Sequence, residues 1–219
     1  MNRLALFDCD GTLVDSQHNI CAAMAECFIA SGREAPAPER TRRVVGLSLV
    51  EAMAAMLPEE APGTHAALAE DYKRVFQAMR AGGLNEEPLF DGIADLIAAL
   101  DAGGWRLGVA TGKSDRGLAL CLKHHAIHQR FATLQTADRH PSKPHPSMIE
   151  AAMAETAASP ETTMMIGDTS YDMEMARAAG VTAIGVAWGY HDATELRRAG
   201  AHHIAGHPRD ILDLIRTLA

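Results

Sequence analysis

Hydrophobic residues follow a helical spacing from residue 15 to residue 87. Ile20, Met24 and Phe28 recur every four positions, and a second amphipathic pattern occupies residues 68–79. Residues three or four apart lie on one face of a helix. Glycines and prolines between the patterns mark where one helix ends and another begins. This stretch therefore predicts several helices and no strand.

The rest of the chain alternates short apolar runs with helical patterns. The runs that predict strands are LALF, WRLGVAT, FATLQTA, TTMMIGD and VTAIGVAWG, and the tail PRDILDLIRTL predicts a last helix. Strands that alternate with helices across short connections are typical of a parallel sheet covered on both faces. We therefore expect an α/β fold, a doubly wound parallel sheet made of residues 1–14 and 88–219, with residues 15–87 inserted as a helical unit after the first strand.

Charge and composition narrow the class of partner. The chain has 219 residues, enough for one large domain or a core with a smaller appendage. Its net charge of −8 argues against a nucleic-acid surface, which needs a basic stripe. An acidic balance still permits a small anionic substrate, because a metal or a few cations invert the local field.

The cysteines and the apolar runs bear on the compartment. Cys9, Cys21, Cys27 and Cys121 form no CxxC pair, which favours a reduced protein. The amino terminus has too short an apolar run for a signal peptide, and no run approaches the roughly 20 residues of a membrane span. We expect a soluble cytoplasmic protein without a membrane partner.

Two carboxylates end the first predicted strand. Asp8 and Asp10 are two residues apart, so on a continuing strand they project from the same side. Like charges placed close together need a cation or a proton between them. The alternative is an Asp-Gly turn at Asp10 and Gly11, which leaves Asp8 unexplained. This stretch alone leaves the turn and an acidic metal site open.

Other predicted strands also end in polar residues. Thr111 and Gly112 end one strand, Lys143 follows another, and Asp168 ends a third, with Asp172 four residues later. In open parallel sheets ligands bind outside the carboxyl ends of the strands. Carboxylates suit Mg²⁺, whereas a hydroxyl, an ammonium and backbone N–H groups at tight glycine turns suit phosphoryl oxygens. The pattern favours phosphoryl chemistry, with Asp8 able to act as nucleophile and Asp10 as acid and base.

The segments FDCDGTL, ATGKS, SKPHP and IGDTSYD resemble the four motifs of the haloacid dehalogenase superfamily, in its order and rough spacing. The helical insertion after the first motif is similar to the cap of the phosphoglycolate phosphatase-like branch. The resemblance covers essentially the whole chain. It implies phosphatase rather than dehalogenase chemistry, because dehalogenases of this superfamily lack the aspartate that stands here at position 10.

The resemblance implies roles for the acidic residues. Asp8 would form a phosphoaspartyl intermediate, and Asp10 would be the general acid and base. Mg²⁺ would be held by Asp8, by the Asp10 carbonyl oxygen and by Asp168, with Asp172 supporting that shell.

It also implies how the substrate is held. Thr111 and Lys143 would hold the phosphoryl group beside the backbone of Gly112. Arg43, in the cap segment RRVVGLSL, is either part of a solvated helix face or a contact for a substrate anion. Lys113 and Ser114 are expected to form a solvated turn and a helix cap, because the glycine spacing before them departs from that of a nucleotide-binding loop.

Together these expectations describe a Mg²⁺-dependent phosphatase that hydrolyses a small phosphorylated metabolite, phosphoglycolate-like or a sugar phosphate. A sugar-phosphate mutase would use the same motifs and remains an alternative. A receiver-like signalling module and an inactive binding protein are less favoured, because Asp8 lies on the first strand with Asp10 beside it. The natural substrate and the oligomeric state are not determined by the motifs.

Overall fold

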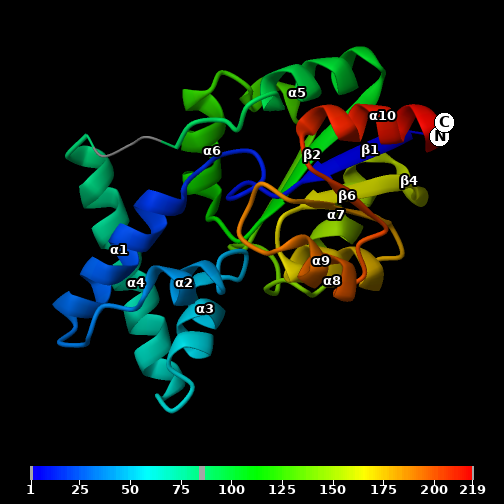
Figure 1. Cartoon of the computed structure of the whole chain (residues 1–219). Helices are drawn as coiled ribbons and strands as arrows, with labels where there is room; N and C mark the ends of the chain where they lie inside the picture. Colours follow the sequence, from blue (N-terminus) through cyan, green and yellow to red (C-terminus); the bar gives the residue numbers. More distant parts are fainter. Residues whose placement is uncertain (1, 84–86, 219) are drawn as a thin grey trace.

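A computed structural model of the chain describes residues 2–83 and 87–218 and contains a six-stranded parallel sheet (Figure 1). Its strands lie in the order β3-β2-β1-β4-β5-β6. Their bounds are β1 Asn2–Phe7, β2 Trp105–Thr111, β3 Thr133–Thr136, β4 Ala158–Gly167, β5 Thr182–Val186 and β6 His203–Ala205. The first strand is central, so its carboxyl end lies at the middle of one edge of the sheet.

Helices cover both faces of this sheet. Those on one face are α5 Ile93–Ala102, α6 Asp115–His124 and α10 Pro208–Leu218, and those on the other are α7 Ser147–Thr156, α8 Ser170–Ala178 and α9 Ala193–Arg198. A short 3₁₀ helix, His128–Arg130, precedes β3. Alternate residues of β1 pack into the two layers, Phe7 into one and Leu6 into the other, and both are fully buried. The expected doubly wound α/β architecture is confirmed.

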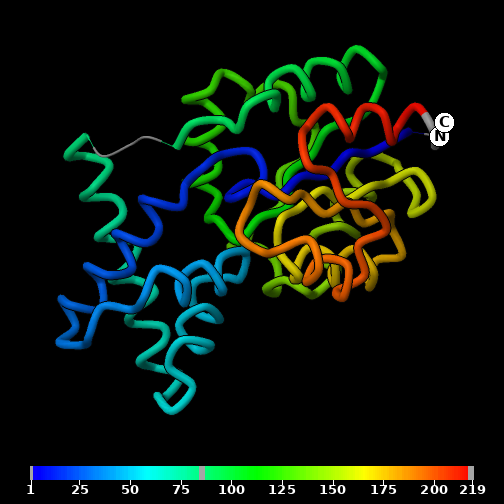
Figure 2. The backbone as a smooth tube through the Cα atoms, in the orientation of Figure 1, coloured from blue at the N-terminus to red at the C-terminus, as the bar shows by residue number. Residues whose placement is uncertain are grey.

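The helices of the insertion pack around a core of their own. They are α1 Gln17–Ala30, α2 Pro38–Arg42, α3 Leu49–Met56 and α4 Pro62–Ala81. The two segments that join them to the sheet run side by side, and the Asp15 N–H donates to the Pro88 carbonyl over 2.8 Å. Figure 2 shows the insertion at one end of the core, with the start of β1 and the end of α10 at the other. The carboxyl ends of the strands therefore face the inserted helices.

Three local predictions differ from the structure. The helical pattern predicted within residues 15–87 is interrupted after α2, which ends at Arg42, since residues 43–46 form turns and Gly46 has a φ of +99°. Strand β4 starts at Ala158, earlier than predicted. Helix α9 and strand β6 have six and three residues, too few to show a periodic pattern. Residues 84–86 lie outside the described residues.

Among the residues that the structure describes, none of the helices combines the length and apolar character that crossing a membrane requires.

Candidate active site

The polar residues at the strand ends meet at one edge of the sheet. Asp8 follows β1, Thr111 ends β2 and Asp168 follows β4, while Lys143 comes from the loop after β3 and Asp172 from the first turn of α8. Each is at most 1% exposed. Charged groups are almost never buried so completely unless they are paired or bind a ligand. The convergence expected from parallel topology is present.

Lys143 joins two of the carboxylates. Its ammonium lies 3.0 Å from Asp8 Oδ1 and 2.6 Å from Asp172 Oδ1. Burial acts to lower the pKa of Lys143, but the carboxylates of Asp172 and Asp8 outweigh it and raise the pKa. The Asp172 Oδ2 accepts hydrogen bonds from the backbone and hydroxyl of Thr169, which starts α8. Asp172 thus fixes both the helix and the ammonium of Lys143.

Asp168 accepts hydrogen bonds from two residues to which the sequence analysis gave no role, Thr12 in the loop after β1 and Tyr190 in the loop after β5. Its Oδ1 accepts a hydrogen bond from the Thr12 hydroxyl (2.8 Å), and its Oδ2 accepts one from the Tyr190 N–H (2.9 Å). A Cβ placed on Gly11 or on Gly189 would lie 2.2 Å from an Asp168 atom, so only glycine fits at these approaches. The donor in the loop after β5 is the backbone N–H of Tyr190, which no side-chain pattern in the sequence reveals.

Three carboxylates form a cluster suited to a divalent cation. One carboxylate oxygen from each of Asp8, Asp168 and Asp172 lies within 4.8 Å of the others. The Asp8 Oδ2 is buried and has no hydrogen-bond partner among the described residues. Burial, with further contributions from Asp172 and Asp10, raises the pKa of Asp8 to about 7 against the opposing effect of Lys143. Burial, followed by repulsion from Asp8, raises the pKa of Asp168 as well.

A hard cation would satisfy the unpartnered oxygen and remove the repulsion between the carboxylates. The donor set therefore fits Mg²⁺, with Asp8 and Asp168 the better placed ligands. Asp172 is less available, because both of its oxygens already accept hydrogen bonds from Lys143 and Thr169.

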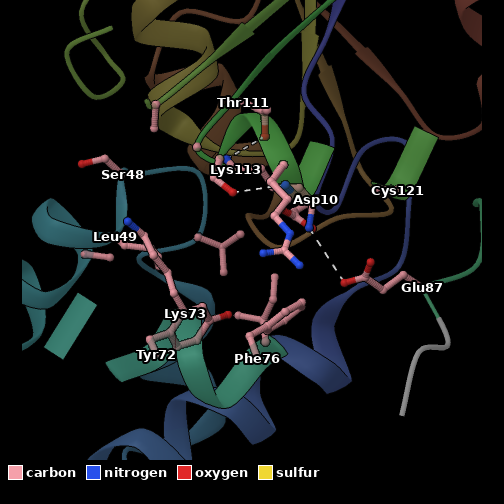
Figure 3. A pocket seen from close by; sticks show the side chains of 18 of the residues that line it. Asp10, Ser48, Leu49, Tyr72, Lys73, Phe76, Glu87, Thr111, Lys113 and Cys121 are labelled. Carbon is pink, nitrogen blue, oxygen red and sulfur yellow. Dashed lines mark hydrogen bonds and ion pairs between the residues drawn. The ribbon is translucent and has the colours of Figure 1, made fainter. Parts of the chain in front are cut away.

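Asp10 has different partners from Asp8. Its Oδ1 accepts a hydrogen bond from the Ser16 hydroxyl and lies 2.8 Å from the ammonium of Lys113. The same ammonium is 3.8 Å from Glu87 (Figure 3). Glu87 also pairs with Arg80 at the end of α4. Asp10 is thus connected, through Lys113, to the segment that leads back from the insertion to the sheet.

The expectation of a solvated turn at Lys113 is wrong. Its side chain is only 10% exposed, because it is enclosed between Asp10, Glu87 and the ring of Phe76, 5.8 Å away. The expectation of a helix cap at Ser114 is confirmed, since the Ser114 hydroxyl accepts a hydrogen bond from the Gly117 N–H over 3.1 Å at the start of α6. A lysine directly after the Thr-Gly strand end was the available signal for a charge at this site.

A cavity of about 890 Å³ lies between the strand ends and the insertion. Asp8, Asp10, Thr111 and Gly112 line it from the core, and residues 44–50 line it from the insertion. Most of the segment RRVVGLSL therefore lines this cavity.

Arg43 lies elsewhere. Its side chain is 60% exposed and pairs with Glu195 of α9, and its carbonyl accepts a hydrogen bond from the Tyr171 hydroxyl (3.0 Å). It is absent from the residues that line the cavity. The anion-binding role considered for Arg43 is not supported by this position, which instead connects the insertion to the core.

Comparison with known proteins agrees with the geometry of the site. The family model described as "Haloacid dehalogenase-like hydrolase" matches residues 5–186. The chain is 37% identical over 210 residues to "Probable phosphatase IndB" of Dickeya dadantii, covering 91% of this chain and 87% of that protein. It is 27% identical over 218 residues to "Phosphoglycolate phosphatase 1" of Pseudomonas aeruginosa, covering 96% and 78%.

One similar protein carries a different name. The chain is 33% identical over 190 residues to "Tyrosine-protein kinase PtkA" of Mycobacterium tuberculosis, covering 86% of this chain but only 63% of that protein.

Solved structures agree with the fold. The crystal structure of a predicted phosphatase from Clostridium acetobutylicum superposes with a TM-score of 0.88 at 26% identity and 99% coverage of both chains. On the family match, the phosphatase relatives and the acidic strand ends, this chain belongs to the haloacid dehalogenase-like hydrolase family and is a phosphatase.

Proposed function

We propose that the chain is a Mg²⁺-dependent phosphatase that hydrolyses a small phosphomonoester through a phosphoaspartyl intermediate on Asp8. The observation that carries this proposal is the buried Asp8 oxygen without a partner, placed among three carboxylates where strand ends meet a cavity. Mg²⁺, held by Asp8, Asp168 and the Asp10 carbonyl oxygen, would neutralise charge on the phosphoryl group and on Asp8.

The side chains divide the reaction between them. The Asp8 carboxylate attacks phosphorus, and the bond from phosphorus to the alcohol oxygen breaks. Asp10 gives a proton to that oxygen and later takes one from the water that cleaves the phosphoaspartate. Thr111, the backbone of Gly112 and the Lys143 ammonium hold the phosphoryl oxygens. Asp172 acts through Lys143, which it holds at 2.6 Å.

The insertion supports a role as a cap, which we assign to residues 15–87. It closes one side of the cavity and carries its own core, so its wall can differ between relatives without disturbing the sheet. A cap that covers the site excludes bulk water from the reacting groups.

The test is phosphate release from p-nitrophenyl phosphate with Mg²⁺. We expect Asp8→Asn to lose activity by at least about 10³-fold, because the nucleophile is removed. Asp91→Asn, a change at a wholly exposed carboxylate, is the matched control and should keep full activity. Activity that survives in Asp8→Asn, or that persists after complete removal of divalent metal, would refute the proposal.

A further inference from the structure

The cavity above Asp8 is large for a small polar ester. Its volume of about 890 Å³ lies near the upper end of the roughly 300–1,000 Å³ found for sites that bind drug-sized molecules. The cavity has this volume while the insertion is in contact with the core. The Ser48 N–H donates to the Ser142 hydroxyl over 2.8 Å, and a Cβ on Gly112 would lie 2.5 Å from the Leu47 carbonyl. The space thus remains while the insertion touches the core.

The wall that faces the catalytic aspartates is mostly apolar. The insertion contributes Met24, Val44, Val45, Leu49, Tyr72 and Phe76 to it. Tyr72 and Phe76 project from α4 toward Lys113, and their rings lie 5.8 Å apart (Figure 3). Carbon surface of this kind binds apolar groups by removing them from water.

Exposed hydrophobic side chains collect at the same cavity. Among the described residues the large hydrophobic side chains that stay exposed are Ile29, Val50 and Leu120, and the last two line the cavity at 43% and 48% exposure. Val50 comes from α3 and Leu120 from α6, so they belong to the insertion and to the core respectively. Single exposed hydrophobic residues are ordinary, whereas their concentration around one cavity marks a binding site.

Three of the cations that line the cavity are paired with carboxylates of the chain. Lys113 pairs with Asp10, Arg80 with Glu87 and Lys73 with Glu70. Arg116 and Lys123, exposed residues of α6, also line the cavity and form no ion pair among the described residues. A second anionic group placed near Asp10 would have to compete with these carboxylates for Lys113 and Arg80. An apolar group meets no such competition.

We propose that the substrate is a phosphomonoester whose alcohol carries a sizeable apolar group, which packs between the insertion and α6. This inference rests on the proposed phosphatase function and names its substrate class. Discrimination comes from carbon surface next to the phosphoryl site rather than from a second charge.

The first test uses alkyl phosphates that differ only in chain length. Ethyl, butyl and hexyl phosphate have leaving groups of similar basicity, so changes in kcat/KM report binding of the chain. We expect about a two- to fourfold rise in kcat/KM per methylene, or at least about tenfold from ethyl to hexyl. A flat series overturns the proposal, as does faster turnover of phosphoglycolate, glycerol 3-phosphate or glucose 6-phosphate than of hexyl phosphate.

Variants at the two exposed positions locate the effect. Val50→Thr and Leu120→Gln keep the side-chain size and suit exposed helix positions. We expect each to lower kcat/KM for hexyl phosphate by about three- to tenfold and to leave glycerol 3-phosphate within twofold. Ile29→Gln is the matched control, since Ile29 is 62% exposed and lies outside the cavity. Equal losses on both esters would mean that these residues serve closure of the insertion, and would overturn the proposal.

Binding without turnover separates this inference from the proposed function. Hexylphosphonate has a carbon–phosphorus bond that a phosphatase does not cleave, and its affinity is measured by calorimetry with Mg²⁺ present. We expect it to bind at least tenfold more tightly than ethylphosphonate, with a negative heat-capacity change. This preference without hydrolysis of any ester would support the apolar site and sink the phosphatase assignment. Hydrolysis of all esters together with equal affinity for both phosphonates would support the phosphatase function and overturn the apolar site.

Discussion

Replacing Asp8 with asparagine should stabilise the metal-free protein at neutral pH, although it removes the proposed nucleophile. In the folded chain burial raises the pKa of Asp8 from 3.8 to about 7. Each tenfold change in an ionisation constant is worth 1.36 kcal/mol, so ionised Asp8 lowers the free energy of unfolding by about 4 kcal/mol. Asparagine resembles the neutral acid in shape and carries no charge.

The sign and the pH range follow from the two pKa values. Because the folded-state pKa lies above the unfolded value, the neutral form is favoured by folding. Below about pH 4 the carboxyl is neutral in both states, and the two proteins should differ little. The difference should grow between pH 4 and pH 7 and be complete above pH 7. Allowing for imperfect mimicry by asparagine, we expect a gain of about 2–4 kcal/mol at pH 8.

The assay is urea unfolding of both proteins in EDTA at several pH values. Asp91→Asn is the control and should change stability by less than about 0.5 kcal/mol at every pH. Mg²⁺ should then stabilise the unsubstituted protein more than Asp8→Asn, because a ligand stabilises the state that binds it. A lower free energy of unfolding for Asp8→Asn than for the unsubstituted protein, in EDTA throughout pH 6–8, would contradict this prediction.

Three further predictions concern the surroundings of the site. Lys113→Met should lower kcat by about 10–100-fold with little change in KM, because Asp10 loses the ammonium 2.8 Å away that orients it. Lys113→Arg should retain more activity than Lys113→Met, and an unchanged kcat in Lys113→Met would contradict this prediction. Arg43→Ala should lower the free energy of unfolding by at most about 1 kcal/mol, since the Arg43 side chain of its pair with Glu195 is exposed. The same change should alter kcat/KM equally for phosphoglycolate and p-nitrophenyl phosphate, and a selective loss on phosphoglycolate would support the anion-binding role of Arg43. Gly112→Ala should lower kcat/KM by about tenfold or more, because its Cβ would lie 2.5 Å from the Leu47 carbonyl and displace the insertion. Unchanged kinetics would mean that the backbone around Leu47 moves to accommodate the methyl group.

The sequence by itself determined which residues share an edge of the sheet. Apolar runs identified every strand of the sheet except β6, and in a parallel sheet every carboxyl end lies at the same edge. This rule alone brings Asp8, Thr111 and Asp168 together, because each ends a strand or directly follows one. The helical spacing of residues 15–87 likewise predicted helices after the first strand, and α1 to α4 lie within this stretch. These predictions succeed because they depend on local periodicity and on one general property of parallel topology.

Only the tertiary structure decided the partners of the charged side chains. Lys113 follows a glycine turn that reads as solvated, yet it pairs with Asp10 and lies 3.8 Å from Glu87, residues far from it in the chain. Arg43 reads as a candidate for the substrate, yet it pairs with Glu195, more than a hundred residues away. Long side chains reach whatever group packing brings within a few ångströms, and no local pattern encodes that distance.

The same limit applies to the backbone contacts that shape the site. Asp168 receives the N–H of Tyr190 over 2.9 Å, and every residue type except proline offers that donor. The apolar wall of the cavity could not be predicted from the sequence either, because a hydrophobic residue that faces a cavity has the same helical spacing as one that faces a core. Chemistry at the strand ends is therefore readable from the chain, whereas what surrounds and selects the substrate depends on how the insertion packs against the sheet.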